Sequence, residues 1–116
     1  MSCAKLTGVS DVCQVVTTVA SAESARALAS GAVLARLAAC AQVFGPLTST
    51  YRWEGELQTA EEWQVIFKTT IGRYEDLQAH VLEQHEYDVP ELLMVPVAAG
   101  NPVYLAWVAE EVAAEA

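Results

Sequence analysis

The chain has 116 residues and a hydrophobic fraction of 53%, which predicts one domain over residues 1–116 with a core of its own. Its 15 Asp and Glu against 6 Lys and Arg give a formal net charge of −9, which argues against nucleic acid as a partner because phosphates need basic neutralisation. No stretch approaches the ~20 apolar residues of a membrane span, and residues 1–11 do not resemble a signal peptide, so we expect no membrane contact, a cytoplasmic location, and a flexible N-terminus before a core at about 12–112.

The first part of the chain predicts a strand and then a helix. Residues 12–18 form an apolar, β-branched run typical of a central strand. Residues 21–39 follow with helical spacing and many alanines, and Ser21 or Ser24 is the expected N-cap. Cys40 then falls at the end of this helix, where the helix dipole disfavours a thiolate. Cys40 is therefore either a small buried residue or a thiol that binds a ligand.

A long β-hairpin is predicted over residues 41–70, with its turn at Glu54 and Gly55 and a bend or bulge at Pro46. Each arm has ~14 residues and spans roughly 45 Å at ~3.3 Å per residue. The helix over 21–39 spans only about 28 Å at ~1.5 Å per residue, so it leaves the hairpin tip uncovered. The hairpin carries three large aromatic side chains that we expect at an interface between copies of the chain: Tyr51, Trp53 and Trp63.

The C-terminal part predicts a helix over 73–84, a loop over 85–90, a strand over 92–97 and a last helix over 103–114. The resulting order is β-α-β-β-α-β with an extra C-terminal helix. That order is typical of the ferredoxin-like α+β fold, in which the helices cover one face of the sheet. The other face needs a cover from outside the chain, which again predicts an oligomer.

His85 is the best single candidate for a metal ligand, because Glu86 and Asp88 beside it are oxygen donors. An imidazole with nearby carboxylates suits a borderline divalent cation such as Cu²⁺. The alternative is a loop histidine that bonds to a backbone group or to a carboxylate. We expect no obligatory cofactor in either case.

A second candidate site combines Cys40, Lys68 and Glu91. A lysine in mid-strand is costly unless it is paired or solvated, so we expect Lys68 to face a cleft between subunits and to pair with Glu91 or with a small anion. The sequence contains no Walker loop, no HExxH and no GxSxG, and we expect no catalytic residues and no enzymatic activity. A small enzyme built on a Cys40–His85 pair remains a minor hypothesis, which requires the fold to bring the two together.

Five tracts carry a family resemblance: RLAAC at 36–40, YRWEG at 51–55, KTT at 68–70, HEYDVPE at 85–91 and GNPVYLAW at 100–107. In this order and spacing they resemble the CutA divalent-cation-tolerance family, over about residues 12–112. The resemblance implies a tight homotrimer of PII-like architecture, in which hairpins and outer strands pair between subunits. It also implies a role in tolerance to divalent cations, copper in particular, through metal or small-ligand binding and signalling, without enzymatic activity.

The chain departs from this family in the region that matters for metals. Glu86 and Asp88 replace the proline and the glutamate of the usual loop. The copper ligands proposed for some members fall at Thr17, Gln84 and His85, and only His85 keeps a ligand type. Our first hypothesis is therefore a trimeric protein of divalent-cation tolerance, and the alternative is a structural trimeric scaffold that binds a protein partner.

Overall fold

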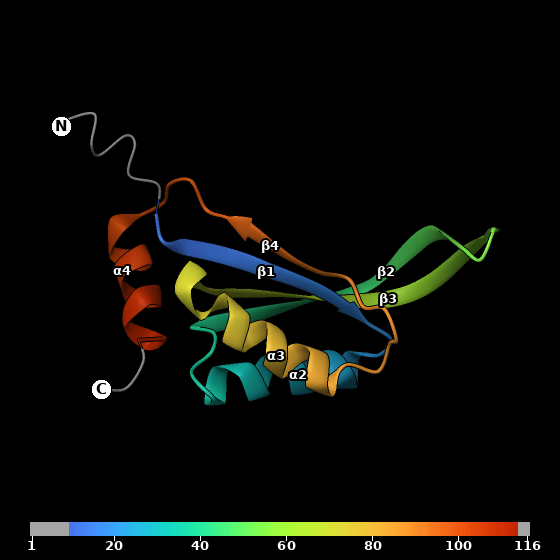
Figure 1. Cartoon of the computed structure of the whole chain (residues 1–116), viewed down its shortest axis with the longest axis horizontal. Helices are drawn as coiled ribbons and strands as arrows, with labels where there is room; N and C mark the ends of the chain where they lie inside the picture. The colour runs from blue at the N-terminus through green and yellow to red at the C-terminus, as the bar shows by residue number, and fades with distance from the viewer. Residues whose placement is uncertain (1–9, 114–116) are drawn as a thin grey trace.

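A computed structural model describes residues 10–113 and confirms the predicted α+β fold (Figure 1). Its elements are, in chain order, β1 Val12–Val19, α2 Ala22–Leu34, β2 Cys40–Trp53, β3 Glu56–Thr70, a 3-10 turn Ile71–Arg73, α3 Tyr74–Gln84, β4 Leu92–Pro96 and α4 Pro102–Glu111. The flexible N-terminus predicted over 1–11 lies almost wholly outside the described residues. Within those residues, no helix has the length and apolar character needed to cross a membrane.

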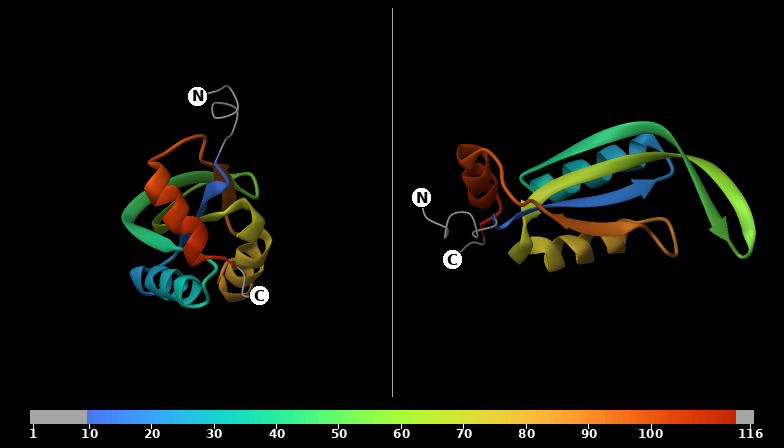
Figure 2. Two further views of the ribbon diagram at one scale, coloured as in Figure 1. Left: turned by 90° about the vertical axis from the view of Figure 1, so that its left-hand side faces the viewer. Right: turned by 90° about the horizontal axis from the view of Figure 1, so that it is seen from above.

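The four strands form one antiparallel sheet in the order β2-β3-β1-β4. This is the ferredoxin-like arrangement, in which β1 lies between β3 and β4. Helices α2 and α3 lie side by side against one face of the sheet, and α4 lies at the end of the body away from the hairpin (Figures 1 and 2). Among the helices of residues 10–113, none lies along the opposite face of the sheet.

The core lies between the sheet and the helices α2 and α3. Its largest fully buried side chains include Val15 of β1, Phe67 of β3, and Leu77 and Val81 of α3, each with an exposed fraction of 0%. Strand residues two apart share a face, so every second residue of β3 from Trp63 onward points toward the helices. A smaller cluster around Val108 attaches α4 to the start of β1.

Helix α2 ends at Leu34, earlier than the sequence predicts. Arg36 adopts a positive φ of 60°, and the N–H groups of Leu37 and Ala38 both donate to the carbonyl of Ala32. Such a left-handed residue commonly ends a helix, but glycine is its usual occupant and the arginine concealed it. Cys40 is therefore the first residue of β2 and not a helix end, so the predicted effect of the helix dipole on its thiol is wrong.

The hairpin extends beyond the rest of the sheet, as its length predicts. β2 and β3 pair from Cys40–Lys68 to Trp53–Glu56, but β1 stops pairing with β3 at Trp63. Residues 56–62 of β3 therefore pair only with β2 and project from the body (Figure 2). Glu54 and Gly55 both have positive φ, 51° and 82°, as a tight turn between right-twisted strands requires.

The bend predicted at Pro46 is present as a break in the register of β2 between Phe44 and Leu47. Gly45 has φ 156°, and a Cβ atom at this position would lie 2.4 Å from Cδ1 of Trp63. The indole of Trp63 therefore packs directly on the backbone of the bend and against the core. Trp63 lies at the base of the hairpin opposite Val19, not at the tip.

Candidate functional site

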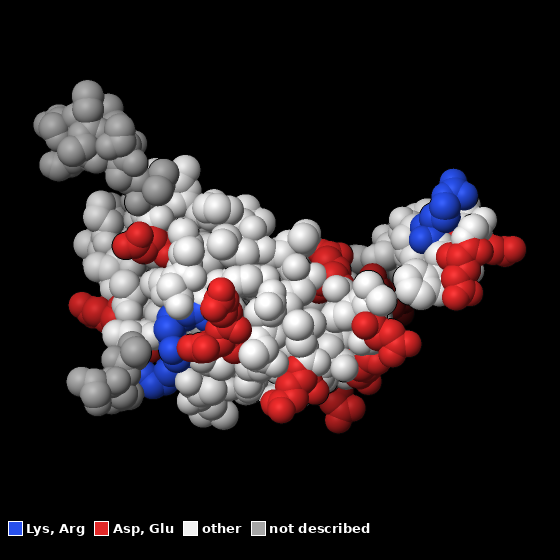
Figure 3. Space-filling model, in the orientation of Figure 1, with Lys and Arg blue, Asp and Glu red and all other residues white. Residues whose placement is uncertain are grey.

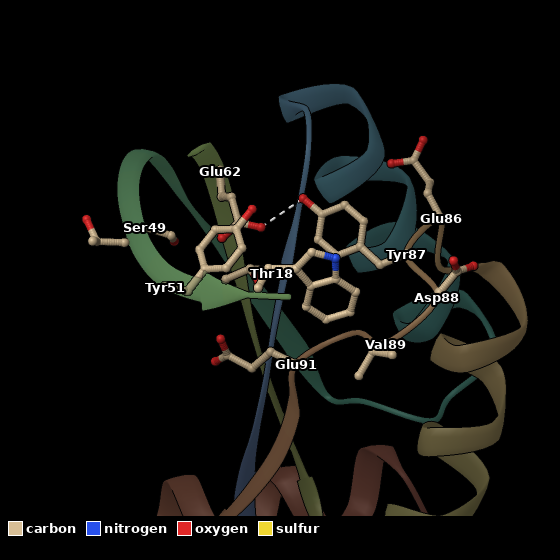
Figure 4. Close-up of a pocket in the computed structure, with 11 residues that line it drawn as sticks. Thr18, Ser49, Tyr51, Glu62, Glu86, Tyr87, Asp88, Val89 and Glu91 are labelled. Carbon is tan, nitrogen blue, oxygen red and sulfur yellow. Dashed lines mark hydrogen bonds between the residues drawn. The ribbon is translucent and has the colours of Figure 1, made fainter. Parts of the chain in front are cut away.

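A pocket of about 720 Å³ lies beside the hairpin, where β1, β2, β3 and the segment between α3 and β4 meet (Figure 4). Its lining residues are Thr18 of β1, Ser49, Thr50, Tyr51 and Trp53 of β2, Glu62 of β3, and Glu86, Tyr87, Asp88, Val89 and Glu91 of that segment. Four of these residues are carboxylates and three are aromatic. We call this cavity the acidic pocket.

Hydrogen bonds to β1 hold the segment after α3 in place. The buried hydroxyl of Thr17 donates to the carbonyl oxygen of Glu91 at 2.7 Å. Nε2 of His85 lies 2.9 Å from the carbonyl oxygen of Thr18, and Nδ1 of His85 accepts from the N–H of Tyr87 at 3.1 Å. These bonds fix the segment so that the Tyr87 hydroxyl reaches Glu62 of β3, whereas Glu86 and Asp88 lie on the side of Tyr87 away from the hairpin (Figure 4).

The same two hydrogen bonds determine which ring nitrogen of His85 carries the proton. A carbonyl accepts and a backbone N–H donates, so the partners assign the proton to Nε2 and leave the Nδ1 lone pair occupied. A metal ion on either nitrogen would have to displace one of these bonds. Within residues 10–113, no three His, Cys, Asp or Glu side chains gather closely enough to hold a metal ion. The geometry matches the alternative stated for His85, a loop histidine bonded to the backbone.

Glu62 and Tyr87 form the buried polar contact of the pocket. The Tyr87 hydroxyl donates to Oε2 of Glu62 at 2.8 Å, and Glu62 is only 8% exposed. Burial, followed by the hydrogen bond and the charge of Glu62, raises the pKa of Tyr87 well above its usual value. Tyr87 therefore stays a neutral donor, and Glu62 forms no ion pair with a basic side chain among the described residues.

The electrostatics of the pocket are one-sided. Glu62, Glu86, Asp88 and Glu91 line it, and no Lys or Arg of the part of the chain that the structure describes does. On the face shown in Figure 3, acidic side chains gather on the body toward the hairpin, and basic ones appear at the opposite end and at the hairpin tip. Carboxylates and aromatic faces both attract cations, so the pocket is suited to a positively charged ligand.

Of the three residues predicted to share a ligand cleft, the structure brings Cys40 and Lys68 together and places Glu91 apart. Cys40 and Lys68 pair across β2 and β3, and Nζ of Lys68 donates to Oε1 of Gln42 at 2.7 Å. Lys68 is level with Val95 near the end of β4, whereas Glu91 lies before the start of β4 and lines the acidic pocket. Within one chain Lys68 therefore bonds to Gln42 and not to Glu91, and a cleft that joins them across subunits stays a prediction.

Cys40 has a partner that the sequence analysis did not foresee. Its Sγ lies 3.4 Å from the hydroxyl of Tyr104, and this contact, followed by burial, raises the pKa of Tyr104 to about 12. Cys40 is level with Lys68 on β3, whereas His85 bonds to Thr18, which is level with Gln64. Four residues of strand, ~13 Å, separate these levels, so the chain does not bring Cys40 and His85 together as a catalytic pair.

The sequence analysis did not single out Glu62 or Tyr87 as site residues. They are 25 positions apart, and neither belongs to a local motif. One signal was available: Glu62 follows the alternation of β3 onto the face away from the helices, directly beside the hairpin aromatics.

Comparison with known proteins gives the family. The profile described as "CutA1 divalent ion tolerance protein" matches residues 13–111. The chain belongs to the CutA family. The resemblance carried by the five sequence tracts is thereby confirmed, and CutA is not a known enzyme family.

The relatives agree in sequence and in structure. The divalent-cation tolerance protein CutA of Thermus thermophilus is 43% identical over 96 residues, which cover 83% of this chain and 93% of that protein. The chloroplastic CutA of Arabidopsis thaliana is 40% identical over 90 residues, 78% of this chain and 50% of the longer plant protein. The crystal structure of CutA from Xylella fastidiosa superposes with a TM-score of 0.86 at 34% identity, covering 89% of this chain and 99% of that one.

Proposed function

We propose that this CutA protein is a non-enzymatic, ligand-binding homotrimer of the response to divalent cations, copper among them, and that it acts in the cytoplasm. The observation that carries the proposal is the acidic pocket, in which four carboxylates meet three aromatic rings with no basic side chain between them. The occupied pocket would act as the signal. The pocket borders the hairpin, so a bound ligand would contact the element that we expect to contact other subunits.

The trimer is supported by the surfaces that the chain leaves uncovered. Trp53 is 49% exposed and Leu57 is 73% exposed on a hairpin that β1 does not reach. Apolar side chains on a projecting two-stranded ribbon are stable in water chiefly when another surface covers them. We expect light scattering to give three times the chain mass and Trp53→Ala to lower the fraction assembled. A monomer at micromolar concentration would contradict the assembly.

The role in cation tolerance is tested in cells that lack the protein. We expect the wild-type chain to restore growth in copper and Glu62→Gln to fail, because the variant removes the buried charge of the pocket. Glu110→Gln on α4 removes an equal charge outside the pocket and should restore growth fully. Equal rescue by both variants would remove the pocket from the function.

Direct coordination of copper is tested separately by calorimetry. His85→Ala removes the imidazole that bonds to Thr18 of the pocket wall. Because both nitrogens of His85 are engaged, we expect Cu²⁺ to bind wild type and His85→Ala with similar affinity. A large loss in His85→Ala would show instead that the imidazole leaves its backbone partners to bind the metal.

The scaffold alternative rests on a different surface. Val103 on α4 is 78% exposed beside Tyr104 and Trp107, whose rings pack 5.6 Å apart. Such a patch is typical of a protein-binding surface. If the protein is a scaffold, Val103→Asp should abolish copper tolerance while Glu62→Gln leaves it intact, the reverse of the result expected for the pocket.

A further inference from the structure

We infer that residues 85–91, between α3 and β4, act as a strap that fixes the angle of the projecting hairpin before subunits meet. The hydrogen bond between Tyr87 and Glu62 is the contact through which this strap restrains the hairpin. The inference rests on the proposed homotrimer and concerns how fast the trimer forms. The partner is a second copy of this chain, which meets a hairpin that is already oriented for contact.

The hairpin joins the body at a level where the sheet can bend. The pairing of β1 with β3 stops at Trp63. The register of β2 against β3 is broken at nearly the same level, between Phe44 and Leu47, and Leu47 pairs with Glu62 just beyond the break. A two-stranded ribbon beyond such a break has neither a third strand nor a continuous ladder to fix its angle. We call this level the hinge.

One side-chain hydrogen bond crosses the hinge. The Tyr87 hydroxyl donates to Oε2 of Glu62 at 2.8 Å, and Glu62 is the last residue of β3 before pairing with β1 begins (Figure 4). Among residues 10–113, no other side-chain hydrogen bond joins residues 47–62 to the rest of the chain. Glu62 is buried, so water competes little for this bond. The bond is therefore the specific polar restraint on the angle of the hairpin.

The strap is itself bonded to β1 near both of its ends. Nε2 of His85 lies 2.9 Å from the carbonyl oxygen of Thr18, and the Thr17 hydroxyl donates to the carbonyl oxygen of Glu91 at 2.7 Å. The N–H of Tyr87 donates to Nδ1 of His85 at 3.1 Å, which fixes the backbone that carries the phenol. Because β1 lies inside the sheet, between β3 and β4, these bonds tie Tyr87 to the rigid part of the body.

A restraint on the free chain changes the rate of assembly more than the lifetime of the trimer. Without the bond, only a fraction of the free chains has the hairpin at the angle that fits a second copy, and the association rate falls with that fraction. In the trimer the neighbouring subunits fix the hairpin, so dissociation changes little. A side chain of the interface itself acts in the opposite way, because interface mutations change mostly the dissociation rate. The two rates therefore distinguish a restraint from an interface contact.

The test follows refolding of the full chain from denaturant by light scattering at several concentrations, so that the concentration-dependent phase reports association. Tyr87→Phe removes the hydroxyl and keeps the ring, and we expect its association rate to fall about fivefold, as the loss of one hydrogen bond implies. Its dissociation rate, measured by exchange between labelled and unlabelled trimers, should change by less than about twofold. Tyr74→Phe is the matched control and should assemble as wild type does, because the Tyr74 hydroxyl donates to Oε1 of Gln78 at 2.8 Å within α3.

Substitutions of the acceptor test the same bond from the other side. Glu62→Gln removes the charge but keeps a carbonyl oxygen for the Tyr87 hydroxyl, so its association rate should stay within about twofold of wild type. Glu62→Ala removes the acceptor and should associate as slowly as Tyr87→Phe. The double variant should be no slower than either single variant, because both remove one shared interaction.

Three results would overturn the inference. Equal association rates in wild type and Tyr87→Phe would show that the bond does not orient the hairpin. An equal loss in Tyr74→Phe would show a general effect of a lost hydroxyl. A loss in Tyr87→Phe that is confined to dissociation would place the phenol in the interface itself.

The inference and the proposed function fail in different ways. A wild-type chain that stays monomeric contradicts the proposed homotrimer and the strap with it. A wild-type chain that assembles and restores copper tolerance, but whose Tyr87→Phe variant associates at the same rate, contradicts the strap alone. A slow Tyr87→Phe variant together with a Glu62→Gln variant that restores copper tolerance fully contradicts the role of the pocket and leaves the strap in place.

Discussion

The two halves of β3 have the same strand geometry and opposite surroundings. From Trp63 to Thr70 the strand pairs on both sides and packs Val65 and Phe67 under the helices, each with an exposed fraction of 0%. Residues 56–62 pair only with β2, and Leu57 among them is 73% exposed. The chain itself covers residues 63–70 with its helices. It leaves residues 56–62 to be covered by another molecule.

The acidic pocket lies where these two halves meet. Glu62 is the last residue of β3 before pairing with β1 begins, and the bend at Gly45 and Pro46 faces it on β2. At this junction the sheet loses its third strand, and the segment after α3 fills only part of the space. The pocket is thus a consequence of the same length mismatch that frees the hairpin.

The largest effect should separate the two halves in stability. Phe67→Ala leaves a cavity in the core and should lower the free energy of unfolding by about 4 kcal/mol. Leu57→Ala at the exposed tip should change it by less than about 0.5 kcal/mol in the unassembled chain, because the side chain already meets water. Denaturant titration measures both. A Leu57→Ala loss as large as that of Phe67→Ala would show that the tip is buried in the assembly studied.

The junction itself is tested at Gly45. Gly45→Ala places a methyl group 2.4 Å from the Trp63 ring and should lower the free energy of unfolding by about 2 kcal/mol. Gly72→Ala is the matched control, because a Cβ there meets nothing within 4 Å, and it should be close to neutral. Thermal denaturation of the two variants compares them. Equal stability would mean that the Trp63 ring moves freely away from the bend.

The stability of the chain should also respond to alkaline pH through Cys13 of β1, which pairs with Thr69 in the covered half of β3. Burial raises the pKa of the Cys13 thiol from 9.0 to about 11, so the folded chain keeps a proton that the unfolded chain releases. The stability from this thiol is complete below pH 9 and is lost as pH rises toward 11, by roughly 2 kcal/mol in all. Denaturant titrations from pH 8 to 11 should show a shallower decline in Cys13→Ala. An unchanged slope would contradict the assignment to Cys13.

The smallest effect is expected at the polar contact of the pocket. Tyr87→Phe removes the hydrogen bond to the buried Glu62 carboxylate and should cost about 1 kcal/mol of stability. Tyr51→Phe is the control, since Tyr51 lines the same pocket but its hydroxyl makes no hydrogen bond to another described residue. Chemical denaturation resolves this difference. A larger loss in Tyr51→Phe would place the more important hydroxyl on the hairpin.

Much of the fold could be predicted because its signals are local. The proline in β2, the Glu54–Gly55 turn and the Ser21 cap of α2 all act within a few residues, and the structure contains each of them. The early end of α2 could not be predicted, because Arg36 takes a left-handed conformation in which glycine is usual. Because the helix ends before Arg36, Cys40 lies at the start of β2 and not at the end of the helix.

The candidate site was less predictable because it depends on contacts between distant parts of the chain. His85 stood out as a metal ligand, but Thr18 and the backbone of Tyr87 occupy its nitrogens. Lys68 and Glu91 were expected to meet, and the register places them at different ends of β4. A side chain's chemistry is visible in the sequence, whereas the partner that uses it is set by packing.

The sequence by itself determined the family, the order of elements and the excess length of the hairpin, because periodicity, caps and turns are properties of neighbouring residues. Only the tertiary structure decided which residues surround the base of the projecting hairpin. Pairing of β1 with β3 ends at Trp63, Tyr87 reaches Glu62 across 25 positions, and four carboxylates come to share one cavity. These are contacts between separate segments, and they exist only once the sheet has set its register and the helices have closed the core.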